Sequence, residues 1–147
     1  AHANSLMFID PYLDPSSPRY REFHRLLSPL AGRSPKPKIE LHRSFNKGVD
    51  QAITPNLAYW QQAFAGLGQQ LTQHGLQAEV FIWSDFHDRH LIADVIGITA
   101  AAGFDVSNTQ NDLTTWSRMG RESKESIQRQ FDPASRPASL IFKFNIG

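Results

Sequence analysis

The sequence predicts an α/β domain, in which helices pack on both faces of a mixed, mostly parallel sheet. Short apolar runs bounded by turn residues alternate with longer segments whose apolar residues recur every three or four positions. The order along the chain is strand, helix, strand, helix, strand, strand, which is typical of helices layered on a sheet. With 147 residues, of which 40% are hydrophobic and 20% charged, the chain is expected to form one domain with its own core.

The first part of the chain contains two expected strands and one expected helix. Residues 6–9 are an apolar run stopped by Asp10-Pro11, which indicates a buried strand ending in a turn. Residues 20–30 place apolar side chains at helical spacing, with charged side chains between them. A loop with two prolines over 32–38 leads to a second strand at 39–45, where apolar and polar residues alternate.

The middle of the chain predicts a long helix and the strongest strand. After a loop at 48–55, Asn56 begins a helical pattern that His74-Gly75 closes, since glycine suits a left-handed cap. Residues 76–83 then form an apolar strand that we expect to be central and covered on both faces. Its two expected faces carry Ala78, Val80 and Ile82 on one side and Phe81 and Trp83 on the other.

The last part of the chain is expected to contain three strands and one helix. Residues 91–99 are predicted as one strand, followed by a turn at 100–103. A short strand at 113–117, a helix at 121–131 and an alternating final strand at 140–146 complete the predicted order. Ligands of such sheets usually bind where strands end and loops converge.

Composition excludes several classes of protein. The net charge of +1 argues against the strong basic field of general nucleic-acid binders, and the absence of cysteine excludes disulfides and thiolate metal sites. No apolar run approaches a membrane span of about 20 residues, and no secretory signal is recognisable. We therefore expect a cytoplasmic protein, or one peripheral at a membrane. Residues 1–5 are expected to be disordered or a cloning remnant, and the chain to be a domain excised from a larger protein.

The candidate site follows the strongest strand, as the pattern His87-x-Arg89-x4-Asp94. On an extended chain, His87 and Arg89 would project from the same face. An imidazole can attack phosphorus or shuttle a proton, a guanidinium matches two phosphate oxygens, and a carboxylate orients the imidazole. The spacing therefore predicts a site for phosphate chemistry; the alternative is a solvated polar loop, with Asp94 as a helix cap or buried acceptor.

This pattern resembles the His-x-Lys-x4-Asp motif of the phospholipase D superfamily, with Arg89 in place of lysine. Together with Asp10-Pro11-Tyr12 after the first strand, residues 39–42 and residues 67–75, it resembles the phospholipase D-like domain at the C-terminus of eukaryotic MIT-domain proteins and related bacterial domains. The similarity covers roughly residues 6 to 132. It implies a phospholipase D-like sandwich.

The resemblance also implies how such a unit works. Catalytic members bring two motifs face to face, whereas this chain has one, so a complete site implies a homodimer. The eukaryotic relatives dimerise and associate with membranes and acidic phospholipids. Arginine is not interchangeable with lysine at a phosphate site, which favours holding a phosphodiester over cleaving it.

Several further residues are candidate ligand contacts. Asp10 ends the first strand and is expected to reach the same sheet edge, where it would contact a cation or Arg89; the alternative is a simple strand terminator. His42 and Arg43 on the second strand and Arg118 and Arg121 after an apolar segment are further candidates, with a surface pair and a solvated loop as their alternatives. The resemblance also implies a small polar residue after the motif, a place that Ser107 and Asn108 could fill. No histidine spacing typical of a metal site and no glycine-rich nucleotide loop is present, so neither metal nor cofactor is expected.

Three hypotheses follow from these residues. The first is a homodimeric module of a larger protein that binds a phospholipid head group or a nucleic-acid phosphodiester through His87, Arg89 and Asp94. The second is a metal-independent phosphodiesterase, a nuclease or phospholipase, with His87 as the nucleophile across a dimer. The third is an interaction domain whose motif is vestigial.

Overall fold

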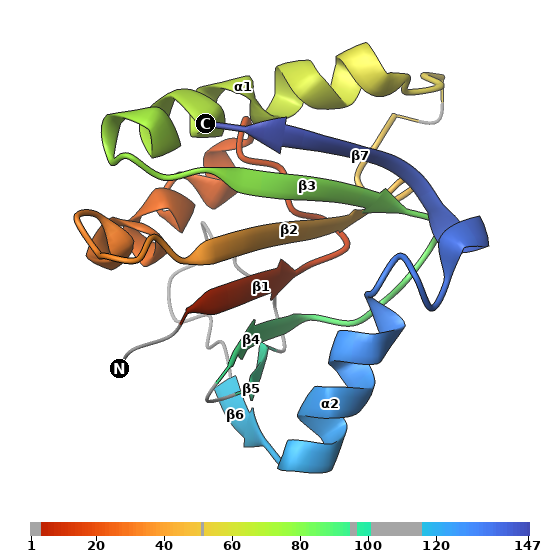
Figure 1. Ribbon diagram of the computed structural model, residues 1–147. Coiled ribbons are helices and arrows are strands. Elements are labelled where there is room, and N and C mark those ends of the chain that lie inside the picture. Colours follow the sequence, from red (N-terminus) through yellow and green to blue (C-terminus); the bar gives the residue numbers. More distant parts are fainter. Residues whose placement is uncertain (1–3, 51, 95–96, 101–115) are drawn as a thin grey trace, which may run out of the picture.

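The computed structural model describes residues 4–50, 52–94, 97–100 and 116–147. It is an α/β fold built on a seven-stranded sheet in the order β6-β5-β4-β1-β2-β3-β7 (Figure 1). The strands are β1 (Ser5–Ile9), β2 (Lys38–Ser44), β3 (Ala78–Trp83), β4 (His90–Ala93), β5 (Gly97–Ala100), β6 (Trp116–Met119) and β7 (Leu140–Ile146). The helices are α1 (Leu57–Gln73) and α2 (Arg121–Gln130), with short 3-10 turns η1 (Pro18–Tyr20), η2 (Phe23–Leu26), η3 (Ser28–Leu30) and η4 (Pro137–Ser139).

The sheet is mixed, and the expectation that it is mostly parallel is wrong. Within the described ranges, β1 pairs with β2 and β2 with β3 in parallel, whereas the four other pairings are antiparallel. Parallel neighbours need a long crossover to bring the chain back to the same end of the sheet. The 3-10 turns and α1 supply that crossover twice, but the connection over 84–89 is too short to do so, and β4 runs back against β1.

Helices cover both faces of the sheet, as the sequence predicts. On one face, α1 and the 3-10 turns pack against the strands in a large core that includes Phe8, Trp60 and Val80. On the other face, α2 and its C-terminal Phe131 cover a smaller core that includes Phe81. β3 is therefore buried on both sides with the predicted division of its residues, although β1 rather than β3 lies in the middle of the sheet.

The predicted helix over 20–30 is replaced by the three 3-10 turns η1, η2 and η3. Pro29 explains why an α-helix does not continue to residue 30, because its missing N–H and its ring interrupt the helical bonds, whereas Pro18 at the start of η1 is compatible with any helix start. Apart from Leu26, which is 37% exposed, the apolar residues at this spacing are buried as predicted, because a spacing of three also fits a 3-10 turn. The buried members are Tyr20, Phe23, Leu27 and Leu30.

The predicted strand over 91–99 is instead a hairpin. β4 and β5 pair in antiparallel register, with His90 opposite Thr99 and Ile92 opposite Gly97. The strand expected at 113–117 is observed from Trp116 as β6, and residues 101–115, with the expected turn at 100–103, lie almost wholly outside the described residues. α2 and β7 match their predicted ranges closely.

Both ends of α1 are as predicted, whereas the described start of the chain is more ordered than expected. The side chain of Asn56 caps α1 by accepting from the backbone N–H of Tyr59, and Gly75 takes the predicted left-handed conformation with φ of 68°. Asn4 and Ser5 were expected to be disordered, but Ser5 begins β1 and the carbonyl of Asn4 accepts from the backbone N–H of Lys38. In the part of the chain that the structure describes, no helix has the length and apolar character to cross a membrane.

Candidate functional site

The three residues of the sequence motif do not come together. β4 runs from His90 to Ala93, so Arg89 enters the strand at one edge of the sheet and Asp94 leaves it at the opposite edge. Five residues of extended chain separate these two side chains by roughly 16 Å along the strand. The carboxylate of Asp94 is exposed and accepts from the backbone N–H of Asn4 at 3.0 and 3.2 Å.

His87 lies in the loop between β3 and β4, not on a strand, and its side chain is 78% exposed. Asp85, rather than Asp94, is the carboxylate beside it: one carboxylate oxygen lies 3.9 Å from His87 Nε2. The other oxygen of Asp85 lies 3.4 Å from Ser44 Oγ and 3.5 Å from Lys47 Nζ. The loop follows β3, so the expected position at the carboxyl end of that strand is confirmed.

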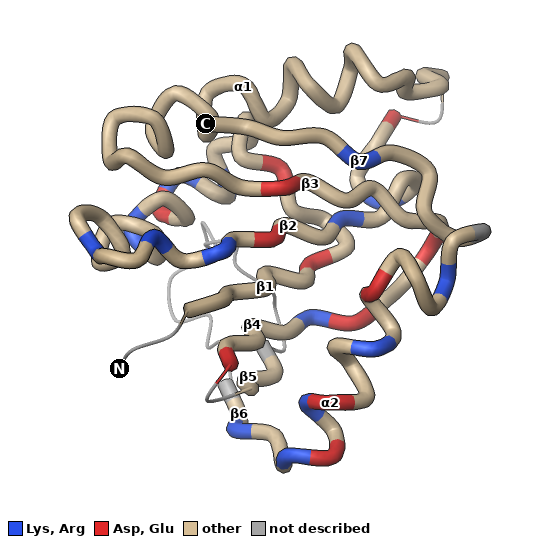
Figure 2. The backbone as a smooth tube through the Cα atoms, viewed as in Figure 1, with Lys and Arg blue, Asp and Glu red and all other residues tan. Residues whose placement is uncertain are grey.

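A pocket of about 420 Å³ lies where β1 and β2 end and the chain turns into β4. It brings Asp10 and Arg89 together, as the sequence suggested for the sheet edge. Its lining residues are Asp10, Tyr12, Asp14, Ser17, Arg19, Tyr20, Arg43, Gly48 and Arg89, which we call the strand-end pocket. Figure 2 shows charged segments at the ends of β1 and β2 and at the entry to β4, whereas α1 carries no charged residue.

Asp10 organises the wall of the strand-end pocket. It is 1% exposed, one carboxylate oxygen accepts from the backbone N–H of Tyr12 at 2.9 Å, and the other accepts from the hydroxyl of Tyr20 at 3.0 Å. Its own backbone N–H donates to the carbonyl of His42 at 3.1 Å. A buried carboxylate requires such partners, and these bonds join η1 and the loop after β1 to β2.

Arg43 holds the two loops of the pocket together. Its Nη1 donates to the carbonyl of Pro11 at 2.7 Å, and its Nη2 donates to the carbonyl of Lys47 at 2.8 Å. Its guanidinium also lies 4.6 Å from the centre of the Trp60 ring, a cation–π contact. Burial lowers the pKa of Arg43 from its ordinary value, while nearby Asp14 opposes that shift. Arg43 is therefore a positioning residue of the pocket, whose two terminal nitrogens each donate to a backbone carbonyl.

Arg89 and Tyr12 form the more accessible side of the pocket. The Arg89 guanidinium lies 5.4 Å from the centre of the Tyr12 ring, and Tyr12 is 41% exposed. Gly48, with φ of 66°, approaches the same ring: a Cβ on this glycine would lie 3.4 Å from Tyr12 Cδ1. An aromatic ring and a planar cation in one pocket suit a ligand that has an anionic group.

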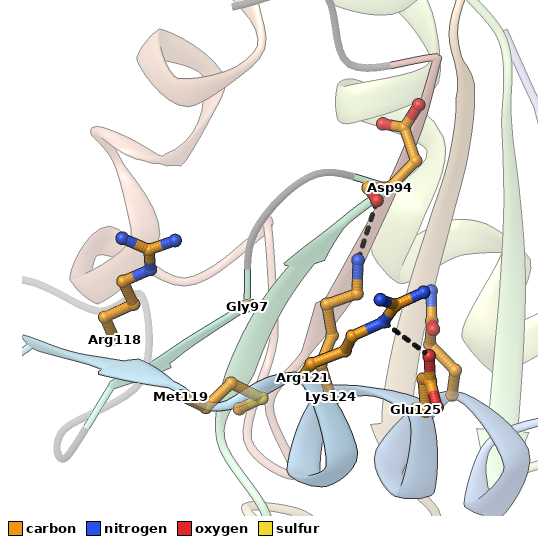
Figure 3. A pocket seen from close by; sticks show the side chains of 8 residues that line it. Asp94, Gly97, Arg118, Met119, Arg121, Lys124 and Glu125 are labelled. Carbon is orange, nitrogen blue, oxygen red and sulfur yellow. Dashed lines mark hydrogen bonds and ion pairs between the residues drawn. The ribbon is translucent and has the colours of Figure 1, made fainter.

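The other predicted arginines lie in a second pocket, at the opposite edge of the sheet. This pocket of about 520 Å³ is lined by Asp94, Gly97, Arg118, Met119, Arg121, Lys124, Glu125 and Gln128 (Figure 3). Lys124 donates to the carbonyls of Ala93 at 3.1 Å and Asp94 at 2.7 Å, and Arg121 donates to Glu125 at 3.2 Å. Arg118 and Arg121 extend in different directions, so they do not form a common grip on one phosphate.

His42 belongs to neither pocket. Neither expectation, a side chain facing the site or a surface pair with Arg43, is correct, because His42 is 0% exposed and lies under α2. Its Nδ1 accepts from the indole N–H of Trp83 at 2.9 Å, and its Nε2 lies 3.0 Å from a carboxylate oxygen of Glu40. The ring stacks on Phe81 at 4.6 Å between centroids.

The remaining points concern two predicted residues, a metal site, and two pocket residues that the sequence did not predict. Ser107 and Asn108 lie outside the described residues. Among the residues that are described, no three His, Asp or Glu side chains gather as a metal site. Sequence reasoning missed Tyr20, which it assigned to the apolar face of an α-helix, and Arg19, which directly precedes that helix. The turn after Asp10-Pro11-Tyr12 was the available signal, since it brings η1 back over the end of β1.

Comparison with known proteins assigns no family to the chain. Its function is therefore inferred from its residues and their geometry. A scan against models of protein families finds none that matches, and a search of the curated proteins finds no match either.

Proposed function

We propose that the chain is a phospholipase D-like module that holds a phosphate-bearing ligand in the strand-end pocket. The observation that carries this proposal is the convergence of Asp10, Tyr12 and Arg89 in one pocket at the ends of β1 and β2. Both sequence signals of the resemblance, Asp10-Pro11-Tyr12 and the motif arginine, meet there. The carboxyl ends of parallel strands are where ligands of α/β sheets usually bind.

Arg89 is the proposed phosphate contact. Its planar fork of donors matches two phosphate oxygens, and the Tyr12 ring beside it limits the directions in which that fork can point. Arg19 lines the same pocket and adds a second cation. Three arginines and two aspartates line the pocket, so the local charge favours an anion only modestly. This fits one phosphate group better than a long polyanion.

The geometry favours holding a phosphate over cleaving it. A phospho-histidine mechanism needs an imidazole oriented by a carboxylate at the reacting phosphorus. His87 is largely exposed, and Asp94 lies at the other edge of the sheet. Asp85 lies near His87 at 3.9 Å, which is beyond hydrogen-bonding distance. The proposed ligands are a phospholipid head group or a nucleic-acid phosphodiester, bound by a homodimer within a larger protein.

Phosphate binding by Arg89→Ala tests the proposal. Inorganic phosphate, measured by titration calorimetry, should bind at least about tenfold more weakly to this variant, since one charge-assisted pair contributes about 1.5 kcal/mol or more. Arg129→Ala removes the same charge from an exposed position on α2 and should bind as the unmodified chain does. Equal binding by the Arg89 variant would reject the assignment.

Cleavage of bis(4-nitrophenyl) phosphate separates the phosphodiesterase hypothesis from the proposal. We expect no turnover by the unmodified chain in the presence of a chelator. Turnover that resists the chelator and disappears in His87→Ala would replace the proposed function with an enzymatic one, because a metal-independent reaction that requires His87 makes its imidazole a catalytic group, as nucleophile or as general base.

A further inference from the structure

His42 has one protonation state that fits its surroundings. The indole N–H of Trp83 can only donate, so His42 Nδ1, which receives this bond at 2.9 Å, must carry a lone pair. Nε2 therefore carries the proton and points it at Glu40, 3.0 Å away. The neutral Nε2–H tautomer is thus fixed at both ring nitrogens, in a side chain that is 0% exposed.

The same histidine helps to hold α2 on the sheet. No residue within α2 is buried, and its first turn has no side-chain cap. The end of the helix is anchored by Phe131, which is 3% exposed and packs edge-on against His42 at 5.5 Å and Trp83 at 5.9 Å between ring centroids. The ring of Phe86 lies 5.0 Å from that of Phe131 between centroids. We call the cluster of His42, Trp83, Phe86 and Phe131 the His42 cage. α2 is also attached through Lys124, which donates to the carbonyls of Ala93 and Asp94, and through the partly buried Ile127, so it is the C-terminal end of the helix that depends on the cage.

We propose that the His42 cage is a proton-sensitive lock, and that acidification detaches α2 while the rest of the fold stays intact. A proton on His42 Nδ1 would face the N–H of Trp83, so two donors would oppose each other across 2.9 Å. The imidazole or the indole must then turn, and either movement disturbs the packing of Phe131 against these two rings. Elements that contribute few buried residues are the first to open.

The charged groups around the cage do not offset a buried imidazolium. Glu40 lies on the same strand, but its carboxylate is shared with Lys38, whose Nζ is 2.9 Å away. From β3, Glu79 lies 3.1 Å from Lys143 of β7. From the segment after α2, Asp132 lines the same small cavity as these four residues.

From β1, the apolar side chains of Met7 and Ile9 lie in the core around the cage. From α2, the uncharged amide of Gln128 lines the small cavity. Burial lowers the pKa of His42, although Glu40 opposes the shift. The lock is therefore expected to loosen as the pH falls below about 6.5, the ordinary pKa of histidine.

His90 provides a matched control. It is half-buried where His42 is fully buried, and it too lies beside α2, lining a small cavity with Glu122, Ser126 and Ile127. Burial lowers its pKa, and Asp88 opposes that shift. Its Nδ1 lies 3.3 Å from the hydroxyl of Thr99 on the neighbouring strand, and it is absent from the His42 cage. A hydroxyl can reverse its role from donor to acceptor when the imidazole gains a proton, whereas an indole cannot.

Hydrogen exchange measured between pH 7.5 and pH 5, corrected for intrinsic rates, tests the lock. We expect protection in α2 to fall at least about tenfold more than protection in α1 as the pH falls. His90→Gln should behave in the same way, whereas α2 protection in His42→Gln should not depend on pH over this range. Parallel loss in α1 and α2, or an unchanged pH dependence in His42→Gln, would overturn the proposal.

Trp83→Phe gives a second test. Removing the indole N–H removes the donor that would oppose a proton on His42 Nδ1, while an aromatic ring still contacts Phe131. The loss of α2 protection between pH 7.5 and pH 5 should therefore be smaller in this variant than in the unmodified chain. An equal or larger loss would contradict the proposed role of the Trp83 bond.

Discussion

The guanidinium of Arg89 lies 5.4 Å from the centre of the Tyr12 ring, in the pocket that also contains Asp10. This contact joins the chain entering β4 to the turn after β1, two segments that are far apart in the sequence. The length of β4 separates Arg89 from Asp94, its expected partner in the sequence motif. The motif is therefore divided between two edges of the sheet, and only its arginine belongs to the strand-end pocket.

Asp94→Ala should leave phosphate binding unchanged. Asp94 accepts from the backbone N–H of Asn4 at an exposed position, so its loss should cost no more than about 1 kcal/mol of unfolding free energy. Titration calorimetry with inorganic phosphate gives the affinity, and urea unfolding gives the stability. Loss of binding comparable to that of Arg89→Ala would restore the motif as a single site.

Arg43→Met should destabilise the fold by about 3 kcal/mol, because it removes the guanidinium donors to the buried carbonyl of Pro11 and the half-buried carbonyl of Lys47, together with the contact on Trp60. The midpoint of urea unfolding reports the change. Arg129→Met, at an exposed position, should change stability by less than about 0.5 kcal/mol. A small effect at Arg43 would mean that the clamp between the two loops does not stabilise the fold.

Gly48→Ala should weaken phosphate binding, whereas Gly32→Ala should not. Both glycines have positive φ, of 66° and 73°, so both substitutions should cost about 1 to 2 kcal/mol through backbone strain. Only the new methyl group at residue 48 contacts the Tyr12 ring. Comparing phosphate affinity in the two variants separates strain from the pocket. Equal affinities would contradict the expectation that the methyl group at residue 48 disturbs phosphate binding through the Tyr12 ring.

Stability should fall as the pH drops below about 6.5, the ordinary pKa of histidine in an unfolded chain. The folded-state pKa values of His42 and His90 are lowered by burial, so the unfolded chain takes up protons first. Urea unfolding at several pH values should show a smaller slope in His42→Gln and in His90→Gln than in the unmodified chain. An unchanged slope in both variants would refute this assignment.

Glu40 should make the unfolding free energy depend on pH in a second, more acidic range. Burial raises its pKa, but the hydrogen bonds from His42 and Lys38 outweigh this, so that its pKa lies below the ordinary value of 4.5. Its contribution is present above that value and is lost as the pH falls further. Glu40→Gln should therefore flatten the stability curve below about pH 4.5, as measured by urea unfolding. An unaltered curve would show that these bonds do not stabilise the carboxylate.

The sequence predicted most of the elements because their patterns are local. The alternation in β3 and β7 and the Asn56 and Gly75 ends of α1 need no knowledge of the rest of the fold. Strand direction was mispredicted because it depends on how far the connection over 84–89 can reach. The helix predicted at 20–30 is wrong because Pro29 interrupts it and because the apolar spacing that suggested it also fits 3-10 turns.

The candidate site was predicted in part for a related reason. Asp10 and Arg89 end or begin strands at the same edge, and that neighbourhood can be inferred from element order. The position of Asp94 could not, because it depends on β4 running against β1. The burial of His42 depends on α2 covering the second face, while Glu40 and His42 look like ordinary surface residues in the sequence.

The most direct test of the strand-end pocket is a titration of the isotopically labelled chain with inorganic phosphate, followed by two-dimensional NMR. The account predicts concentration-dependent shifts in the backbone signals of Asp10 and Tyr12 and in the side-chain Nε–H signal of Arg89. Signals from Arg118, Arg121 and Lys124 at the opposite edge should stay in place. Shifts confined to those three residues, or no shifts at all, would contradict the assignment of the phosphate site to this pocket.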